Sequence, residues 1–331
     1  MQNHFQEYAQ TMKPSLDAAF ARELDRLLGD TQPLHSWGGE KLLTAGKKIR
    51  GALLCLVATT LGGTLEDALP RAVAVELIQT ATLIHDDFVD QHRSRRDEAA
   101  IWTLEGARRA VLLGDIVFAS AIQMMSELGR EDGLIVSRAI AEVSRGAYRE
   151  PLNPSALMEE IAAGRVQGAL YEKIIYLKTG VLFGAACKLG AVAARAGEKL
   201  RQAWCRYGLK IGEAYQIADD LHDVERALRT RSITAGEMTA IAPALLFFVG
   251  ESRPYILEAL GRESLELRGK PLQHFQAAAS SMRAEKERRL RSAAAEIGGD
   301  AAGGGLHRLA SKAPWDLIRM FDGARPLASL P

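Results

Sequence analysis

The chain reads Leu83-Ile84-His85-Asp86-Asp87-Phe88-Val89-Asp90 in one stretch and Gln216-Ile217-Ala218-Asp219-Asp220-Leu221-His222-Asp223 in another. Both stretches contain the spacing Asp-Asp-x-x-Asp, and both follow apolar, helix-like runs. A single cluster of this kind is commonly a solvated acidic face or a helix N-terminus. Two clusters at the ends of buried runs, where unpaired charge is costly, predict two acidic walls that face one cavity.

In a helix, Asp86 and Asp90 lie one turn apart on the same face, and Asp87 points about 100° away from them. Asp219 and Asp223 repeat this arrangement. Mg²⁺ takes one or two protein carboxylates and completes its coordination with water and phosphate oxygens. The clusters therefore predict magnesium ions that bridge to a diphosphate on an apolar chain.

The rest of the sequence predicts helices. Strand signals are scarce, and apolar residues recur at spacings of three and four within stretches rich in Ala, Leu, Glu and Arg. The run from Val73 to Ile84 is apolar on nearly every side, which is typical of the centre of a bundle. Further helices are expected within 107–128, 169–194 and 204–227, and exposed amphipathic helices within 263–297.

We therefore expect an all-α fold, a single domain over residues 1–331 with about ten or more helices around a central cavity. Residues 298–331 are expected to form a Gly-rich connection and a C-terminal tail. The tail regains an apolar pattern around Trp315 to Phe321, which predicts that it docks back onto the bundle.

Composition limits the classes of partner. Formal net charge is +1, from 42 basic and 41 acidic residues, which gives no reason to expect nucleic acid or an anionic membrane as partner. Three cysteines without metal-type spacing fit a reducing, cytoplasmic location. No signal peptide is recognised, and no apolar window is expected to span a bilayer.

Basic residues supply the rest of the predicted pocket. Gly46-Lys47-Lys48-Ile49-Arg50 places Lys47 and Arg50 at a helix start, where backbone N–H groups and two cations suit a diphosphate. Arg95-Arg96 follows the first acidic cluster. Lys178-Thr179-Gly180 interrupts an apolar helix and predicts a kink that lines a cavity. Taken singly, these elements are also typical of a basic surface, of charge neutralisation and of a helix C-terminus.

Together these elements resemble the trans-isoprenyl diphosphate synthase (polyprenyl synthetase) family from about Leu42 to Leu246, in particular a geranylgeranyl diphosphate synthase-like member. The resemblance rests on the Gly-Lys-x-x-Arg element, both aspartate-rich motifs, Arg95-Arg96, Leu113-Gly114-Asp115, Lys178-Thr179 and Gln216. It implies the isoprenoid synthase type I fold, a homodimer, and Mg²⁺-dependent condensation of isopentenyl diphosphate with an allylic diphosphate.

The resemblance also implies a role for each matched residue. Magnesium ions, about three, would bind to Asp86, Asp90, Asp219 and Asp223. The implied catalytic residues are Asp86, Asp87, Asp90, Lys178, Thr179, Gln216 and Asp219. Arg95, Lys178 and Gln216 would contact the allylic diphosphate. Isopentenyl diphosphate would bind to Lys47, Arg50, Gln79 and Arg96.

The chain departs from the family pattern at three positions. Gly51 stands where Pro is usual, Asp97 where Gly is usual, and Glu237 where Lys is expected. Glu237 removes a cation from the allylic diphosphate site, and Arg229 or Arg231 is a candidate to replace it.

Product length in the family depends on side chains one to two turns before the first motif. Here these are Ile78, Ala81 and Thr82, with no aromatic among them. The resemblance thus implies a product longer than fifteen carbons, with twenty or more expected.

Two other readings compete with an active synthase. A class I terpene cyclase shares the helical fold and the magnesium chemistry, but it usually lacks the second Asp-Asp-x-x-Asp motif and the Lys47/Arg50 element. A non-catalytic, regulatory subunit of such a synthase tends to lose its aspartates. Both clusters are intact here, and Glu237 is the residue that keeps the subunit reading open.

Overall fold

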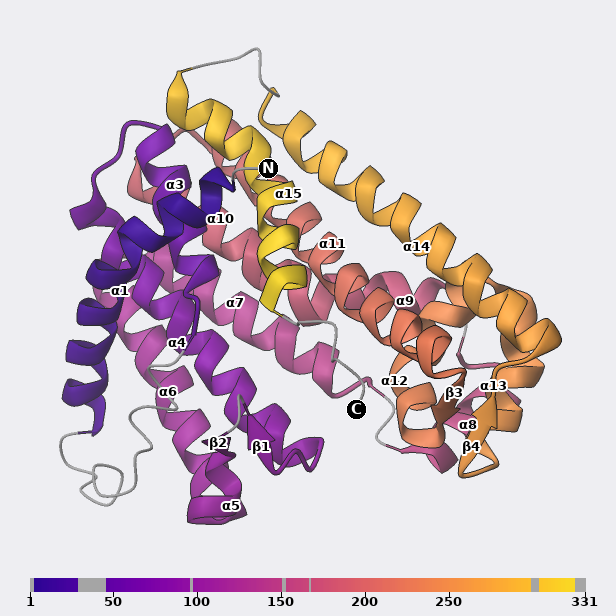
Figure 1. Cartoon of the computed structure of the whole chain (residues 1–331). Helices are drawn as coiled ribbons and strands as arrows, with labels where there is room; N and C mark the ends of the chain where they lie inside the picture. The colour runs from indigo at the N-terminus through magenta and orange to yellow at the C-terminus, as the bar shows by residue number, and fades with distance from the viewer. Residues whose placement is uncertain are drawn as a thin grey trace. The chain divides into compact units, whose positions relative to one another are not determined.

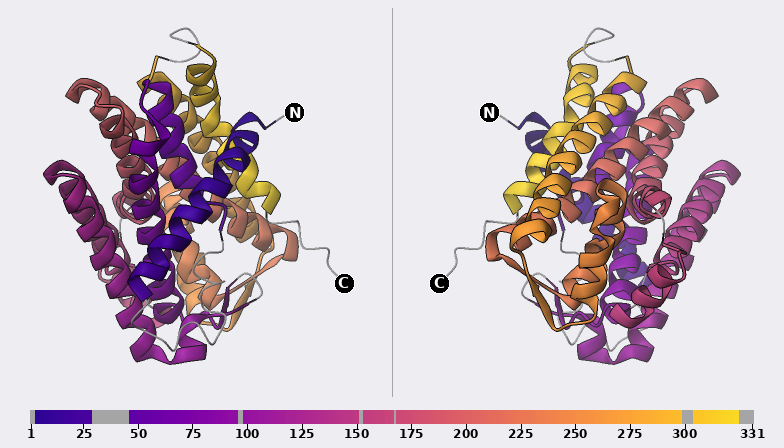
Figure 2. Two further views of the ribbon diagram at one scale, coloured as in Figure 1. Left: turned by 90° about the vertical axis from the view of Figure 1, so that its left-hand side faces the viewer. Right: turned by 90° about the vertical axis from the view of Figure 1, so that its right-hand side faces the viewer.

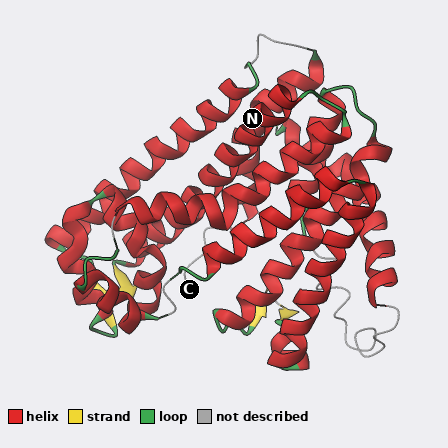
Figure 3. Ribbon diagram, turned by 180° about the vertical axis from the view of Figure 1, so that it is seen from behind, coloured by secondary structure: helices red, strands yellow, loops and turns green. Residues whose placement is uncertain are grey.

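The structure is a computed structural model, and it describes residues 3–28, 46–95, 98–150, 153–166, 168–298 and 304–324. The described chain is almost entirely helical (Figure 3), so the all-α prediction is confirmed. The strands are two short antiparallel pairs, β1 (Ser94–Arg95) with β2 (Glu98–Ala99) and β3 (Ser232–Thr234) with β4 (Ser264–Glu266).

The chain divides into two compact units. Unit 1 comprises Met1–Ala141, Leu182–Gly208 and Glu296–Pro331, and unit 2 comprises Glu142–Val181 and Leu209–Ala295. α7 (Arg130–Ala147) and α11 (Glu198–Thr230) contribute residues to both. The expectation of one domain around a central cavity stays a prediction.

Unit 1 is built on α3 (Ile49–Thr60) and α4 (Leu65–Val89), which pack against each other (Figure 1). Residues 51–58 of α3 are all buried, and so are residues 72–78 of α4. Helices apolar on every side stabilise the fold only when other helices surround them, as the sequence of α4 predicts. α5 (Ile101–Glu105) and α6 (Ala107–Leu128) cover the next side of α4.

The C-terminal tail docks within unit 1. α15 (Gly305–Ala324) packs against α1 (His4–Leu28) and α3, and Figures 1 and 2 show it beside α1. The buried Asp316 carboxylate accepts a hydrogen bond from the Phe5 backbone N–H at 2.9 Å. The first amide groups of a helix lack intrahelical partners, so this carboxylate caps α1 from the far end of the sequence.

Unit 2 has its own core. α12 (Ala235–Phe248) packs against α8 (Pro154–Ala162), α9 (Gly168–Ile175) and α13 (Arg253–Leu260), and a short turn, η3 (Gly250–Ser252), joins α12 to α13. α14 (Gly269–Glu296) buries Phe275, Met282 and Leu290 on one side, so the amphipathic pattern of the sequence is confirmed.

The apolar stretch predicted within 169–194 forms three elements: α9, the π-helix η2 (Tyr176–Gly180) and α10 (Val181–Ala193). Two stretches, Ala107–Leu128 and Ala169–Ala193, are long and apolar enough to cross a membrane by length and composition alone, which the sequence analysis did not anticipate. The second window is 78% buried inside the structure, which is the environment of a core helix, and the first is 33% buried.

Candidate active site

The first acidic cluster lies at the C-terminal end of α4, in unit 1. The Asp90 backbone N–H donates to the Asp86 carbonyl oxygen at 2.8 Å, so the two residues lie one turn apart as predicted. Asp86 is half-buried and Asp90 is exposed. Two oxygen donors one turn apart, one of them open to solvent, suit a cation that also binds water and phosphate.

The middle aspartate of this cluster has a protein partner. Asp87 is buried, and Arg95 in β1 donates to it from Nε at 2.8 Å and from Nη2 at 2.6 Å. A forked, charge-assisted pair of this kind fixes both groups in orientation. The structure therefore brings together Asp87 and Arg95, two residues that the sequence assigns to one site. Arg96 and Asp97 lie outside the described residues.

The Leu113-Gly114-Asp115 element packs against the same helix end. A Cβ at Gly114 would lie 2.1 Å from His85 Nε2, so no side chain fits there. His85 Nε2 lies 3.0 Å from the Val111 carbonyl oxygen and 3.6 Å from Asp115 Oδ1. The glycine thus allows α6 to hold the His85 ring directly beside Asp86.

The Gly-Lys-x-x-Arg element forms the start of α3, as predicted. Lys48 has φ 49° and is buried with its ammonium 3.4 Å from the centre of the Phe20 ring. The Arg50 guanidinium lies 4.4 Å from the centre of the Phe183 ring. Contacts of cations with aromatic faces orient these side chains. Gln79 is half-buried on α4.

Lys47 lines a pocket of about 460 Å³ in unit 1. Its ammonium donates to the Met320 carbonyl oxygen of α15 at 2.6 Å. The other lining residues come from α1, α15 and the start of α3: Gln6, Ala9, Gln10, Lys13, Gly46, Arg319 and Met320. The C-terminal helix therefore contributes to the surroundings of this lysine, which no local sequence pattern indicates.

The second acidic cluster lies on α11, in unit 2. Its middle residue, Asp220, accepts hydrogen bonds from the Tyr171 hydroxyl at 2.6 Å and from Gln216 Nε2 at 3.0 Å. Burial raises the pKa of Asp220 to about 7, and the Asp219 charge adds to the rise, while the hydrogen bonds from Tyr171 and Gln216 oppose it. The sequence analysis missed Tyr171.

The two acidic clusters have one arrangement in common. In each, the middle aspartate is held by a side chain of the protein, Arg95 for Asp87 and Tyr171 for Asp220. The outer aspartates of the second cluster, Asp219 and Asp223, are half-buried.

The Lys178-Thr179-Gly180 element is part of the π-helix η2, so the predicted kink is present as a wider turn. A Cβ at Gly212 on α11 would lie 2.7 Å from the Gly180 Cα, so the two backbones touch at a pair of glycines. Across this contact the Thr179 hydroxyl donates to Gln216 Oε1 at 2.6 Å. The exposed Lys178 ammonium donates to Glu150 Oε2 at 2.9 Å. Single π-turns of this kind are frequent at functional sites.

Glu237 contacts two other residues, Thr234 and Arg226. It forms a capping box with Thr234 at the start of α12, accepting from the Thr234 backbone N–H at 2.8 Å. Its other oxygen lies 3.2 Å from Arg226 Nη2, and Arg226 also donates to Asp223 at 3.0 Å. Arg229 and Arg231 are exposed. The cation nearest the second cluster in this segment is therefore Arg226, three residues after Asp223, which the sequence analysis did not select.

The donor set of each cluster, carboxylates one helical turn apart, is of the kind that Mg²⁺ takes together with water and phosphate oxygens. Within the described ranges, no group of three or more His, Cys, Asp or Glu side chains gathers closely enough to hold a metal ion. Zinc sites in proteins commonly need such a closed group, whereas Mg²⁺ is held by one or two carboxylates plus phosphate. The outer aspartates of each cluster, one turn apart on a helix, match the second pattern.

Comparisons with known proteins identify the family. The family model described as "Polyprenyl synthetase" matches residues 37–232. The geranylgeranyl diphosphate synthase of Methanosarcina mazei is 32% identical over 61% of this chain, and the match spans 62% of the length of that relative. The short chain isoprenyl diphosphate synthase of Methanothermobacter thermautotrophicus is 34% identical over 72% of this chain and 75% of its own length.

Solved structures show the same fold. The crystal structure of geranylgeranyl pyrophosphate synthetase from Pyrococcus horikoshii aligns with a TM-score of 0.74 over 97% of this chain and 99% of that one, at 21% identity. The likeness confirms the isoprenoid synthase type I fold, and the family match covers both aspartate-rich motifs. The chain therefore belongs to the polyprenyl synthetase family.

Proposed function

We propose that this protein is a Mg²⁺-dependent trans-prenyltransferase that condenses isopentenyl diphosphate with an allylic diphosphate. The observation that carries the proposal is the pair of Asp-Asp-x-x-Asp clusters, each with its middle aspartate held by the protein and its outer aspartates one helical turn apart. Family membership and the synthase names of the relatives support it.

Magnesium, about three ions, would bind to Asp86, Asp90, Asp219 and Asp223 and supply charge stabilisation for the departing diphosphate. In this proposal Lys178, Arg95 and Gln216 would contact the same group. Thr179 fixes the orientation of Gln216 by its hydrogen bond to Oε1. With the amide oxygen occupied, the Gln216 NH₂ group is directed toward Asp219 and Asp220.

The second substrate needs a cation-rich site that positions its double bond. We assign isopentenyl diphosphate to Lys47, Arg50, Gln79 and Arg96. In the bound pair the allylic carbon–oxygen bond breaks as diphosphate departs, and the double bond of isopentenyl diphosphate forms the new bond to the allylic carbon. The released diphosphate takes the proton that is then lost, and positioning supplies much of the rate. No side-chain nucleophile is required.

The product is proposed to have twenty carbons or more. Ile78 and Ala81 are buried and Thr82 is half-buried on α4, one to two turns before Asp86, and none is aromatic. Relatives of this chain are named as synthases of farnesyl, geranylgeranyl and geranylfarnesyl diphosphates.

We also propose a homodimer in the cytoplasm. On α6, Leu112 is 50% exposed and Ile116 is 39% exposed, one turn apart on one face of unit 1. An exposed apolar stripe on a helix is typical of a protein interface. Light scattering after size exclusion measures the mass, and Ile116→Glu should shift it toward the monomer. An unchanged dimer would place the interface elsewhere.

The central experiment is product analysis of the purified chain with isopentenyl diphosphate, Mg²⁺ and each allylic primer from five to twenty carbons. Extension of farnesyl diphosphate to products of twenty carbons or more supports the proposal. A product that stops at fifteen carbons contradicts the chain length. Absence of diphosphate release with every primer contradicts the activity and favours a non-catalytic subunit.

A further inference from the structure

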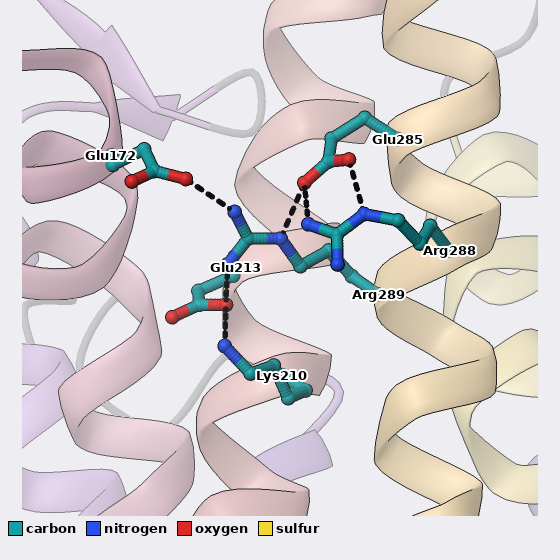
Figure 4. Close-up of polar contacts among 6 residues, drawn as sticks. All are labelled: Glu172, Lys210, Glu213, Glu285, Arg288 and Arg289. Carbon is teal, nitrogen blue, oxygen red and sulfur yellow. Dashed lines mark hydrogen bonds and ion pairs between the residues drawn. The ribbon is translucent and has the colours of Figure 1, made fainter. Parts of the chain in front are cut away.

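Six charged side chains, none of them assigned to the site above, form a balanced network in unit 2 (Figure 4). Its centre is Arg289 on α14, whose side chain is 7% exposed. The other members are Glu172 on α9, Lys210 and Glu213 on α11, and Glu285 and Arg288 on α14. Three cations and three carboxylates leave no net charge in the network.

Arg289 uses each of its nitrogens for a different carboxylate. Nη1 donates to Glu213, Nη2 donates to Glu172 at 2.9 Å, and Nε donates to Glu285 at 2.6 Å. A guanidinium is a rigid, planar fork, so three partners on three helices fix the relative positions of those helices. A lysine ammonium has no such fork and could not reproduce these directions.

Two of these carboxylates lie next to groups that hold the second acidic cluster. Glu172 directly follows Tyr171 on α9, and the Tyr171 hydroxyl donates to Asp220 at 2.6 Å. Glu213 lies one turn before Gln216, which donates to Asp220 at 3.0 Å. Arg289 therefore braces the two helices whose side chains converge on Asp220.

Glu213 also borders the π-helix. Its Cγ would lie 3.4 Å from a Cβ placed at Gly180, so this carboxylate packs beside the turn that carries Lys178 and Thr179. The Thr179 hydroxyl in turn fixes Gln216. The network therefore lies next to Thr179, which holds Gln216, and next to Tyr171, which holds Asp220.

At the centre of the network Arg289 and Glu213 are both buried, and such a pair is a weak source of stability because desolvation offsets most of its attraction. We propose that Arg289 is a positioning residue for the second acidic cluster: it aligns α9 and α11 so that Tyr171 and Gln216 hold the cluster in the geometry that binds the Mg²⁺–allylic diphosphate. The inference rests on the proposed function. It assigns no contact between Arg289 and substrate.

The test is Arg289→Lys, which keeps the charge and removes the fork, with Arg288→Lys as the matched control. Arg288 lies next to it, is 63% exposed and pairs only with Glu285 among the network members. Calorimetry measures binding of a non-ionising allylic thiolodiphosphate with Mg²⁺, and steady-state kinetics measure KM for each substrate.

Arg289→Lys should weaken analogue binding and raise KM for the allylic substrate about 10-fold, the effect typical of groups that orient metal ligands. KM for isopentenyl diphosphate should stay within about twofold of the unmodified value. Arg288→Lys should match the unmodified protein in every measurement. Equal effects on both substrates, or a lower Tm with unchanged analogue binding, would overturn the inference. If Arg289→Lys does not fold, Glu172→Gln replaces it, since Glu172 is 55% exposed. That variant should weaken analogue binding about threefold, and unchanged binding would overturn the inference.

Failure of the proposed function gives a different result. In that case the unmodified protein itself would bind no allylic analogue in the presence of Mg²⁺. If the unmodified protein binds the analogue and Arg289→Lys binds it equally well, the prenyltransferase proposal stands and the positioning role is wrong.

Discussion

The Arg95 guanidinium holds the buried Asp87 carboxylate through three hydrogen bonds, with Nε 2.8 Å from both oxygens and Nη2 2.6 Å from one. The pair ties the segment after α4 back to the end of that helix. The aspartates of the first cluster therefore differ in their surroundings: Asp87 is paired with Arg95, whereas Asp90 is exposed to solvent.

This difference gives a prediction for Asp87→Asn and Asp90→Asn. Asp87→Asn leaves a charged guanidinium facing an amide, so the free energy of unfolding should fall by about 2 kcal/mol. Asp90→Asn should change it by less than about 0.5 kcal/mol, because the side chain is exposed. Urea denaturation measures the free energy of unfolding of both variants.

Activity should behave differently: prenyl transfer should fall about 100-fold in Asp90→Asn, because this change removes a proposed metal ligand without changing stability. Equal stability of the two variants would show that the Arg95 pair does not stabilise the fold.

Glu237→Lys tests whether this position lacks a substrate-binding cation or has a structural purpose. The capping box with Thr234 requires an acceptor at Glu237, so the lysine variant should lose about 1 kcal/mol of stability. Glu237→Gln is the matched control, because glutamine also serves in a capping box, and it should remain within about 0.5 kcal/mol. We expect KM for the allylic substrate not to fall in Glu237→Lys. A tenfold fall would mean that the missing cation limits binding.

Gly114→Ala should disturb the helix end that carries the first cluster. The added Cβ would lie 2.1 Å from His85 Nε2, so the His85 ring must move. Overpacking of this kind costs about 1–3 kcal/mol. Gly236→Ala is the control, because nothing lies within 4 Å of the added atom and the residue is in α12, and there stability should rise by up to about 1 kcal/mol. Thermal unfolding compares the two, and a neutral Gly114→Ala would contradict the close packing of His85.

Stability should decline at alkaline pH because of buried thiols. Burial raises the pKa of Cys55 from 9.0 to about 12, with the Glu76 charge adding to the rise, and burial also raises the pKa of Cys187. The folded state keeps these protons while the unfolded state loses them above about pH 9, so their contribution is complete below pH 9 and declines as the pH rises toward 12.

The measurement is urea denaturation at pH 7, 9 and 10, with Cys55→Ala as the control that lacks one of the two groups. The variant should lose less stability over this interval than the unmodified protein. Under native conditions at pH 8, a thiol reagent should leave Cys55 and Cys187 unlabelled until the chain unfolds. Rapid labelling of both thiols would contradict their burial.

The sequence alone determined the helical class, the family and the position of most elements. Residues 107–128 form a helix with the predicted limits, and the kink at Lys178-Thr179-Gly180 is a π-helix. These features depend on local periodicity, on glycine and on short motifs, and such signals are contained in neighbouring residues. Motif spacing was equally sufficient for the family, because the two aspartate clusters recur at fixed positions within helices.

Only the tertiary structure decided which side chains meet. Asp220 is held by Tyr171, 49 residues away, and Arg289 reaches Glu172 across 117 residues. Lys47 donates to Met320 across 273 residues. Periodicity predicts the face on which a residue lies but not the partner that packs against it. The sequence therefore determined the chemistry of each cluster, and tertiary packing decided which side chain of the protein holds the middle aspartate.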